Sequence, residues 1–200
     1  MSRAGNIIDK GLAAALKLAE LTPWDELTLH AIVAEAKLNL ADFHGVADKA
    51  DLSAGVEGYF DKAMSAGPLD TDESARTRLF DVLMMRFEAM EDARDGVMSY
   101  FRWRDRTLPG LQIRVRGRLE TARWALACAG LDAQDGVSRA AMIAGLSWAI
   151  LQAERAWRQE TSPDLTRTMA ALDGELVKME ERAATLRRRA QRRKDGSDED

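Results

Sequence analysis

The chain contains few of the residues from which reactive or metal-binding sites are commonly built. It has one cysteine, Cys128, so neither an intramolecular disulfide nor a cysteine-based zinc site can form. Its two histidines, His30 and His44, show neither the His-x-Glu nor the Glu-x-x-His spacing of zinc and di-iron ligands. The glycines form neither a phosphate-binding loop nor a dinucleotide fingerprint. We therefore expect no enzymatic activity, no metal and no cofactor.

Long apolar runs are also missing. The longest uncharged run, from Ala140 to Ala153, has 14 residues, fewer than the roughly 20 that a membrane-spanning helix needs. Lys17 and Glu20 interrupt the apolar N-terminal stretch, which excludes the core of a signal peptide. A start at Met1 without an arginine-rich leader favours a bacterial cytoplasm over a mitochondrial matrix. We predict a cytoplasmic protein, with peripheral contact to the inner membrane as an open alternative.

Prolines are rare, and each of the four lies at a boundary between segments of helical periodicity. These segments predict nine helices, over residues 6–21, 28–36, 40–45, 48–64, 73–92, 96–105, 111–129, 137–159 and 164–194. Residues 111–116 alternate with period two and would locally fit a strand. Asp48 is expected to be an N-cap, and Pro163 to lie in the first turn of the last helix.

The pattern predicts an all-α protein in which three short helices precede a larger helical bundle. We expect a degenerate helix-turn-helix-like module over 1–64, a C-terminal helical domain over 65–194 and a disordered acidic tail over 195–200.

The N-terminal helices are similar to the DNA-binding module of TetR-type regulators. The similarity rests on the stretch from Ile32 to Ala36, on Phe43, and on Lys49 with Leu52 at the start of the next helix. The chain departs from that family at the turn glycine, which is Lys37 here, and at the phosphate-contacting tyrosines, which are replaced by residues 43–46, Phe-His-Gly-Val.

Charge argues against DNA as a partner of this module. Residues 1–63 hold six basic and ten acidic side chains, and residues 38–46 include no arginine or lysine. Neutralisation of phosphates supplies most non-specific DNA affinity, and base readout here would rest on Asn39 alone. We predict a scaffold that does not bind DNA; a TetR-type transcriptional regulator that binds DNA and a hydrophobic effector is the alternative.

Most of the chain also resembles the COQ9 family of ubiquinone biosynthesis proteins. The matching segments, in order, are Trp24 after the first helix, residues 78–87, residues 139–142, and Ser162-Pro163-Asp164, eight residues after Glu154. The resemblance implies a TetR-like fold, a homodimer and a C-terminal pocket for an isoprenoid lipid or quinone precursor. It also implies an accessory protein that presents this lipid to the hydroxylase of the pathway at the membrane. An all-helical interaction protein without a ligand is a further alternative.

Bulky apolar side chains of the C-terminal domain are the candidates for lining such a pocket. Methionine and aromatic side chains adapt to a flexible ligand, although stripes of this kind also form ordinary cores. The candidate residues are Phe80, Leu83, Met84, Phe87, Met98, Phe101, Trp124, Met142, Leu146 and Trp148. We expect an elongated apolar cavity between the fifth, seventh and eighth predicted helices.

Two basic clusters are candidate contacts for anionic lipid. The first, over residues 102–118, holds six arginines against Asp105. The second, between Arg182 and Lys194, includes five candidate membrane-contact residues: Arg187, Arg188, Arg189, Arg192 and Arg193. Its apolar face is weak, so contact would be electrostatic. A solvated helix end that complements the helix dipole is the alternative explanation.

Overall fold

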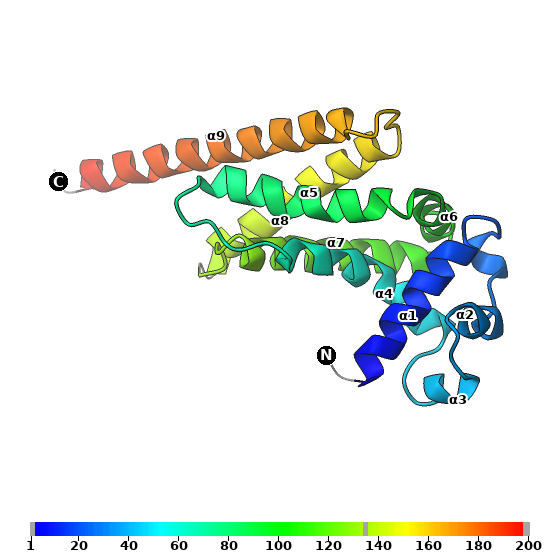
Figure 1. Cartoon of the computed structure of the whole chain (residues 1–200). Helices are drawn as coiled ribbons and strands as arrows, with labels where there is room; N and C mark the ends of the chain where they lie inside the picture. The colour runs from blue at the N-terminus through cyan, green and yellow to red at the C-terminus, as the bar shows by residue number, and fades with distance from the viewer. Residues whose placement is uncertain (1–2, 134–135, 198–200) are drawn as a thin grey trace.

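The computed structural model of the protein describes residues 3–133 and 136–197, and this part of the chain contains helices and loops but no strand. Two short 3₁₀ turns, η1 (Trp24–Glu26) and η2 (Lys62–Ser65), connect longer elements. The α-helices are α1 (Arg3–Leu18), α2 (Leu29–Glu35), α3 (Leu40–Phe43), α4 (Lys49–Asp61), α5 (Ala75–Glu91), α6 (Arg94–Arg104), α7 (Leu108–Cys128), α8 (Gly136–Trp157) and α9 (Thr166–Ser197). The arrangement is consistent with the predicted all-α, TetR-like fold (Figure 1). None of the described helices combines the length and the apolar character needed to cross a membrane.

Side chains at the predicted boundaries start several helices. The hydroxyl of Thr28 accepts a hydrogen bond from the backbone N–H of Ala31, and Asp48 and Asp51 form a reciprocal capping box at the start of α4. The prediction that Asp48 is an N-cap is therefore confirmed. Lys37, between α2 and α3, has φ +54°, a left-handed conformation that favours glycine. The resemblance places a turn glycine at this position, and the backbone turn is kept here without that residue.

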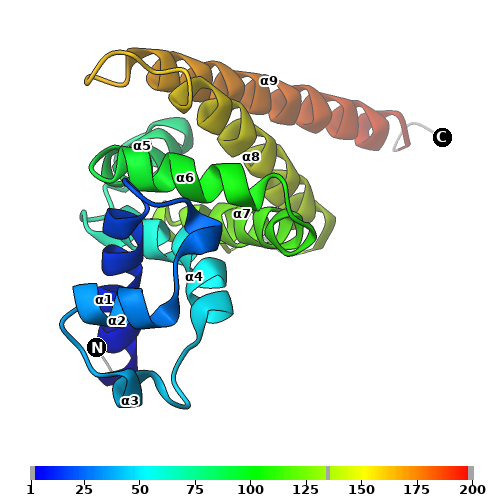
Figure 2. The ribbon, with the colours of Figure 1, turned by 90° about the vertical axis from the view of Figure 1, so that its right-hand side faces the viewer.

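The C-terminal helices form the larger layer of the molecule. α8 and α9 lie side by side and run in opposite directions, and the far end of α9 projects past the other helices (Figures 1 and 2). α5 packs against α9 on one side and against α4 and η2 on the other. The loop between η2 and α5 lies where the sequence predicts a boundary, yet α4 contacts both α5 and α7.

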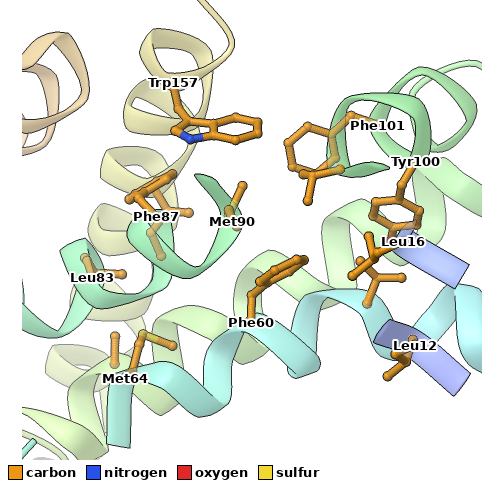
Figure 3. Close-up of a cluster of buried hydrophobic side chains, with 14 of the residues drawn as sticks. Leu12, Leu16, Phe60, Met64, Leu83, Phe87, Met90, Tyr100, Phe101 and Trp157 are labelled. Atoms are coloured by element: carbon orange, nitrogen blue, oxygen red, sulfur yellow. The ribbon is translucent and has the colours of Figure 1, made fainter. Parts of the chain in front are cut away.

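A single hydrophobic cluster runs through both predicted modules. Leu12 and Leu16 of α1, Phe60 of α4, and Phe87 of α5 are all buried in it (Figure 3). Glycine allows close contacts between α1 and α6 and between α4 and α7: a Cβ on Gly96 would lie 2.1 Å from the carbonyl oxygen of Leu16 in α1, and one on Gly117 of α7 would meet the Glu57 side chain of α4. The N-terminal helices therefore share one interior with the bundle.

Two expectations about local structure need correction. Pro163 lies in the turn before α9 rather than in its first helical turn, because the chain reverses at Leu165, whose φ is +52°. Residues 195–197 continue α9 instead of beginning a disordered tail, and residues 198–200 lie outside the described residues. The predicted helix over 111–129 is confirmed: the alternating stretch 111–116, which would locally fit a strand, is helical, since Thr107 caps α7 and Pro109 occupies its first turn.

Candidate ligand groove and buried charge network

A surface groove runs between α5 and the first turns of α9. Two hollows of about 420 and 460 Å³ adjoin there and share the side chains of Phe80 and Met169. We call them together the α5–α9 groove. Their other lining residues are Arg76, Thr77, Asp81, Met84, Met85, Glu88, Pro163, Asp164, Leu165, Ala170 and Asp173.

The middle of the groove is apolar and its margins are charged. Phe80 and Met85 are half-buried, whereas Met169 keeps 40% of its surface exposed. At one end, the guanidinium of Arg76 lies 2.5 Å from a carboxylate oxygen of Asp173. Exposed large apolar side chains that line a hollow provide contact surface for an apolar partner.

The ten predicted pocket residues separate into three groups. Leu83, Met84, Phe87, Phe101 and Leu146 are buried in the core. Phe80, Met98 and Met142 are partly buried against it, and Trp124 and Trp148 are about half exposed. Phe80 and Met84 line the α5–α9 groove, and Trp124 lines a separate hollow where α4 meets α7.

The interior where a cavity was expected is occupied by core contacts. Leu83, Phe87 and Leu146 each have 0% exposure, and Phe87 points into the same cluster as Met90 and Trp157 (Figure 3). Phe101 has another environment: the guanidinium carbons of Arg104 and Arg158 lie 3.9 and 4.5 Å from its ring centre. The hollows described above lie at the surface instead of between α5, α7 and α8.

Sequence reasoning missed several residues of the groove. Met85, Met169 and Leu165 line it although they were not among the candidates. Met85 lies in the segment 78–87, and Leu165 directly follows the Ser162-Pro163-Asp164 motif. Two of the segments that support the family resemblance therefore form opposite sides of one groove, a relation that spacing alone does not reveal.

A buried network of charges lies on the other side of α5. Arg86 is 2% exposed, and its guanidinium contacts Glu57 at 2.5 Å and Asp61 at 2.7 Å, both on α4. Thr121 of α7 donates to the carboxylate of Asp61. Burial raises the pKa of Asp61, and the charge of Arg86 opposes this shift only in part.

Arg104 and Glu154 extend this network to α6 and α8. Arg104 donates to Glu57 and, at 2.7 Å, to Glu154; Glu154 also accepts from Arg118 and Arg158. Burial alone would raise the pKa of Glu154, but the charges of the three arginines outweigh it and hold the pKa at about 2. Five helices, α4 to α8, are thus connected through charges that are largely excluded from water.

Carboxylate partners account for four of the six arginines of the basic cluster over residues 102–118. Arg104 and Arg118 pair with Glu154, Arg114 lies 3.4 Å from Asp105, and Arg116 lies 2.8 Å from Glu120. The remaining two, Arg102 and Arg106, have no carboxylate partner among the described residues. The positive charge that the sequence places here is therefore mostly neutralised within the protein.

The N-terminal module also keeps few free positive charges. Lys17 pairs with Glu35, Lys62 with Asp9, and the Arg3 guanidinium lies 3.6 Å from Asp42. The helix at the position of a recognition helix, α3, has four residues and no basic side chain. Attraction of a phosphate backbone has little support from this geometry.

The remaining candidate groups are possible metal ligands, Cys128 and the predicted membrane-contact arginines. Over residues 3–133 and 136–197, no group of three or more His, Cys, Asp or Glu side chains could hold a metal ion. Burial raises the pKa of Cys128, which disfavours the reactive thiolate. Among the five predicted membrane-contact arginines, Arg188 is exposed, whereas the side chains of Arg187, Arg189, Arg192 and Arg193 lie outside the described part of the structure.

No family model, curated protein or solved structure matches the chain. The COQ9 resemblance consequently stays a prediction that rests on the quoted segments.

Proposed function

We propose that this protein is a non-catalytic, lipid-binding accessory protein of ubiquinone biosynthesis. In this proposal the α5–α9 groove binds the chain of an isoprenoid quinone precursor, and a homodimer presents that lipid to the hydroxylase of the pathway. The proposal combines the sequence resemblance with the position of the groove.

One observation supports the proposal more than any other. The segment 78–87 and the Ser162-Pro163-Asp164 motif, which are far apart in the sequence, form the two sides of one apolar groove. If the resemblance reflected only a common helical core, the matching segments would not need to lie together at a surface hollow.

The shape and chemistry of the groove suit a flexible chain. Its lining on α5 runs from Arg76 to Glu88, about 18 Å along the helix axis at 1.5 Å per residue. Met84, Met85 and Met169 line it, and unbranched methionine side chains adapt to ligands without a fixed shape. The charged margins leave the polar head of a lipid near water.

The test is to place a charge in the groove without disturbing the core. Met169→Glu changes a side chain that is 40% exposed, so the fold should tolerate it. Because an unpaired carboxylate against an apolar chain is costly, we expect the lipid extracted from the purified variant to fall at least about tenfold. Mass spectrometry of the extracted lipid measures this loss.

Leu69→Glu is the matched control. Leu69 is 48% exposed and lies outside the groove, so this variant should retain the lipid content of the wild type. Thermal unfolding of both variants should match the wild type. A wild-type protein that copurifies without an isoprenoid lipid, or equal lipid in all three proteins, would contradict the proposal.

A further inference from the structure

Acidic side chains surround one half of the α5–α9 groove. Its hollow of about 460 Å³ is lined by Asp81, Glu88 and Asp164, all of them exposed, and by no basic residue of the described chain. None of these three carboxylates forms an ion pair with another described residue. The second hollow adds Asp173 and Arg76. Four acidic side chains and one basic one give the groove lining a formal charge of −3.

The spacing along α5 places two of these carboxylates on either side of the apolar lining. One stripe of the helix, with the i, i+3, i+4, i+7 spacing of a single face, consists of Asp81, Met84, Met85 and Glu88. The two acidic residues are about 10 Å apart along the helix axis, with the methionines between them. Asp164 lines the same hollow from the turn before α9. A chain that lies on the methionines therefore has carboxylates on several sides.

The positive groups beside the groove are already used by the protein itself. The guanidinium of Arg76 lies 2.5 Å from Asp173 and 3.6 Å from Glu180. The start of α9 would attract an anion through its free backbone N–H groups. Glu160, which is 9% exposed, instead accepts hydrogen bonds from three N–H groups of the turn and of α9, those of Thr161, Ser162 and Thr168. An anionic ligand would have to displace these carboxylates.

We infer that the groove selects its ligand by the charge of the head group. It takes an amphiphile whose uncharged head donates hydrogen bonds, as a phenol does, and it rejects the same chain with a carboxylate or phosphate head. Asp81, Glu88 and Asp164 are the specificity-determining residues, because carboxylates accept hydrogen bonds from a hydroxyl and repel an anion. The inference rests on the proposed function, since it concerns the ligand of the same groove.

The exposure of these carboxylates sets the size of the effect. Each repels an anion through water and so contributes little alone, but the three act in the same direction. We expect the anionic amphiphile to bind about tenfold more weakly than the neutral one at low salt. Salt screens charges at this distance, so the difference should shrink strongly at about 1 M salt.

Two probes with the same chain test the selection: 3-farnesylphenol, which is neutral at pH 7.5, and 3-farnesylbenzoic acid, which is ionised. Equilibrium dialysis against the purified protein, with mass spectrometry of the bound probe, gives both Kd values at low and high salt. Any copurified lipid competes equally with both probes, so the ratio of the two Kd values does not depend on it.

Asp81→Asn/Glu88→Gln removes two charges and keeps the shape of both side chains. We expect this variant to bind the acid at least about threefold more tightly than the wild type does, and the phenol within about twofold of the wild type. Glu26→Gln/Asp132→Asn is the matched control. It makes the same change in net charge at exposed positions outside the groove, so it should keep the wild-type ratio.

Each outcome separates this inference from the proposed function. Equal binding of the two probes, tighter binding of the acid, or the same ratio in the groove variant and the control overturns the selection by charge and leaves the lipid carrier intact. Binding of neither probe overturns both. Phenol binding that Met169→Glu leaves unchanged also overturns both, because the ligand would then lie outside the groove.

Discussion

The two sides of α5 differ in chemistry and in burial, although their residues are neighbours in the sequence. On one side, Arg86 is buried against Glu57 and Asp61 of α4. On the other, Phe80 and Met85 face a groove that α9 covers only in part. The charged side is enclosed and its main groups are paired, whereas the apolar side stays open to solvent.

This contrast indicates which side of α5 is structural and which is available for binding. A buried guanidinium has to keep its carboxylates, because an unpaired buried charge is far more costly than a lost surface contact. An apolar groove that is open to water loses little when its side chains change and gains when an apolar molecule enters it. Substitutions on the two sides should therefore have different effects.

The largest effect is expected from Glu57→Ala. Glu57 joins Arg86 to Arg104, so the substitution leaves two buried guanidinium groups short of a partner. We expect a loss of about 3–5 kcal/mol in the free energy of unfolding, measured by urea denaturation. Glu120→Ala, which removes only the exposed partner of Arg116, should change stability little. Similar losses in the two variants would show that the buried network stabilises the fold no more than an exposed ion pair does.

The next effect concerns pH. The pKa of Glu154 lies at about 2 in the folded protein, below the ordinary value of 4.5. The carboxylate therefore stabilises the fold fully above about pH 4.5 and loses this contribution as the pH falls towards 2. We expect the stability difference between the wild type and Glu154→Gln to be large at neutral pH and to shrink across this range.

Urea denaturation of both proteins at a series of pH values measures this difference. The raised pKa of Asp61 acts in the opposite direction, but it is present in both proteins and cancels in the comparison. A difference that does not change with pH would mean that the carboxylate charge contributes nothing to the network.

The smallest effect separates the core from the groove. Leu146 is completely buried, so Leu146→Trp should overpack the interior and cost about 1–3 kcal/mol. Met169→Trp, in the open groove, should leave stability unchanged and reduce the copurified lipid instead. Thermal unfolding and lipid mass spectrometry on the same samples give both values. A stable Leu146→Trp protein would reveal free volume around Leu146, a side chain with 0% exposure.

Local sequence determined much of the helical architecture. Capping side chains such as Asp48, Thr28 and Thr107 act on backbone groups within three residues, so their effect can be predicted without knowing the fold. The apolar pattern likewise selected Leu83, Phe87 and Leu146 as candidates for lining an apolar interior. It could not distinguish a wall of a cavity from a packed core, because both require the same helical stripe.

The tertiary structure alone decided which charges are free and where the groove lies. Arg102, Arg104 and Arg106 are near neighbours in the sequence, yet the direction of α6 buries Arg104 against α4 and α8 and leaves the other two in water. The groove depends in the same way on the turn at Leu165, which brings α9 alongside α5. Whether an arginine or a methionine is buried, paired or exposed depends on the helix that packs against it. Local sequence does not specify which helix that is.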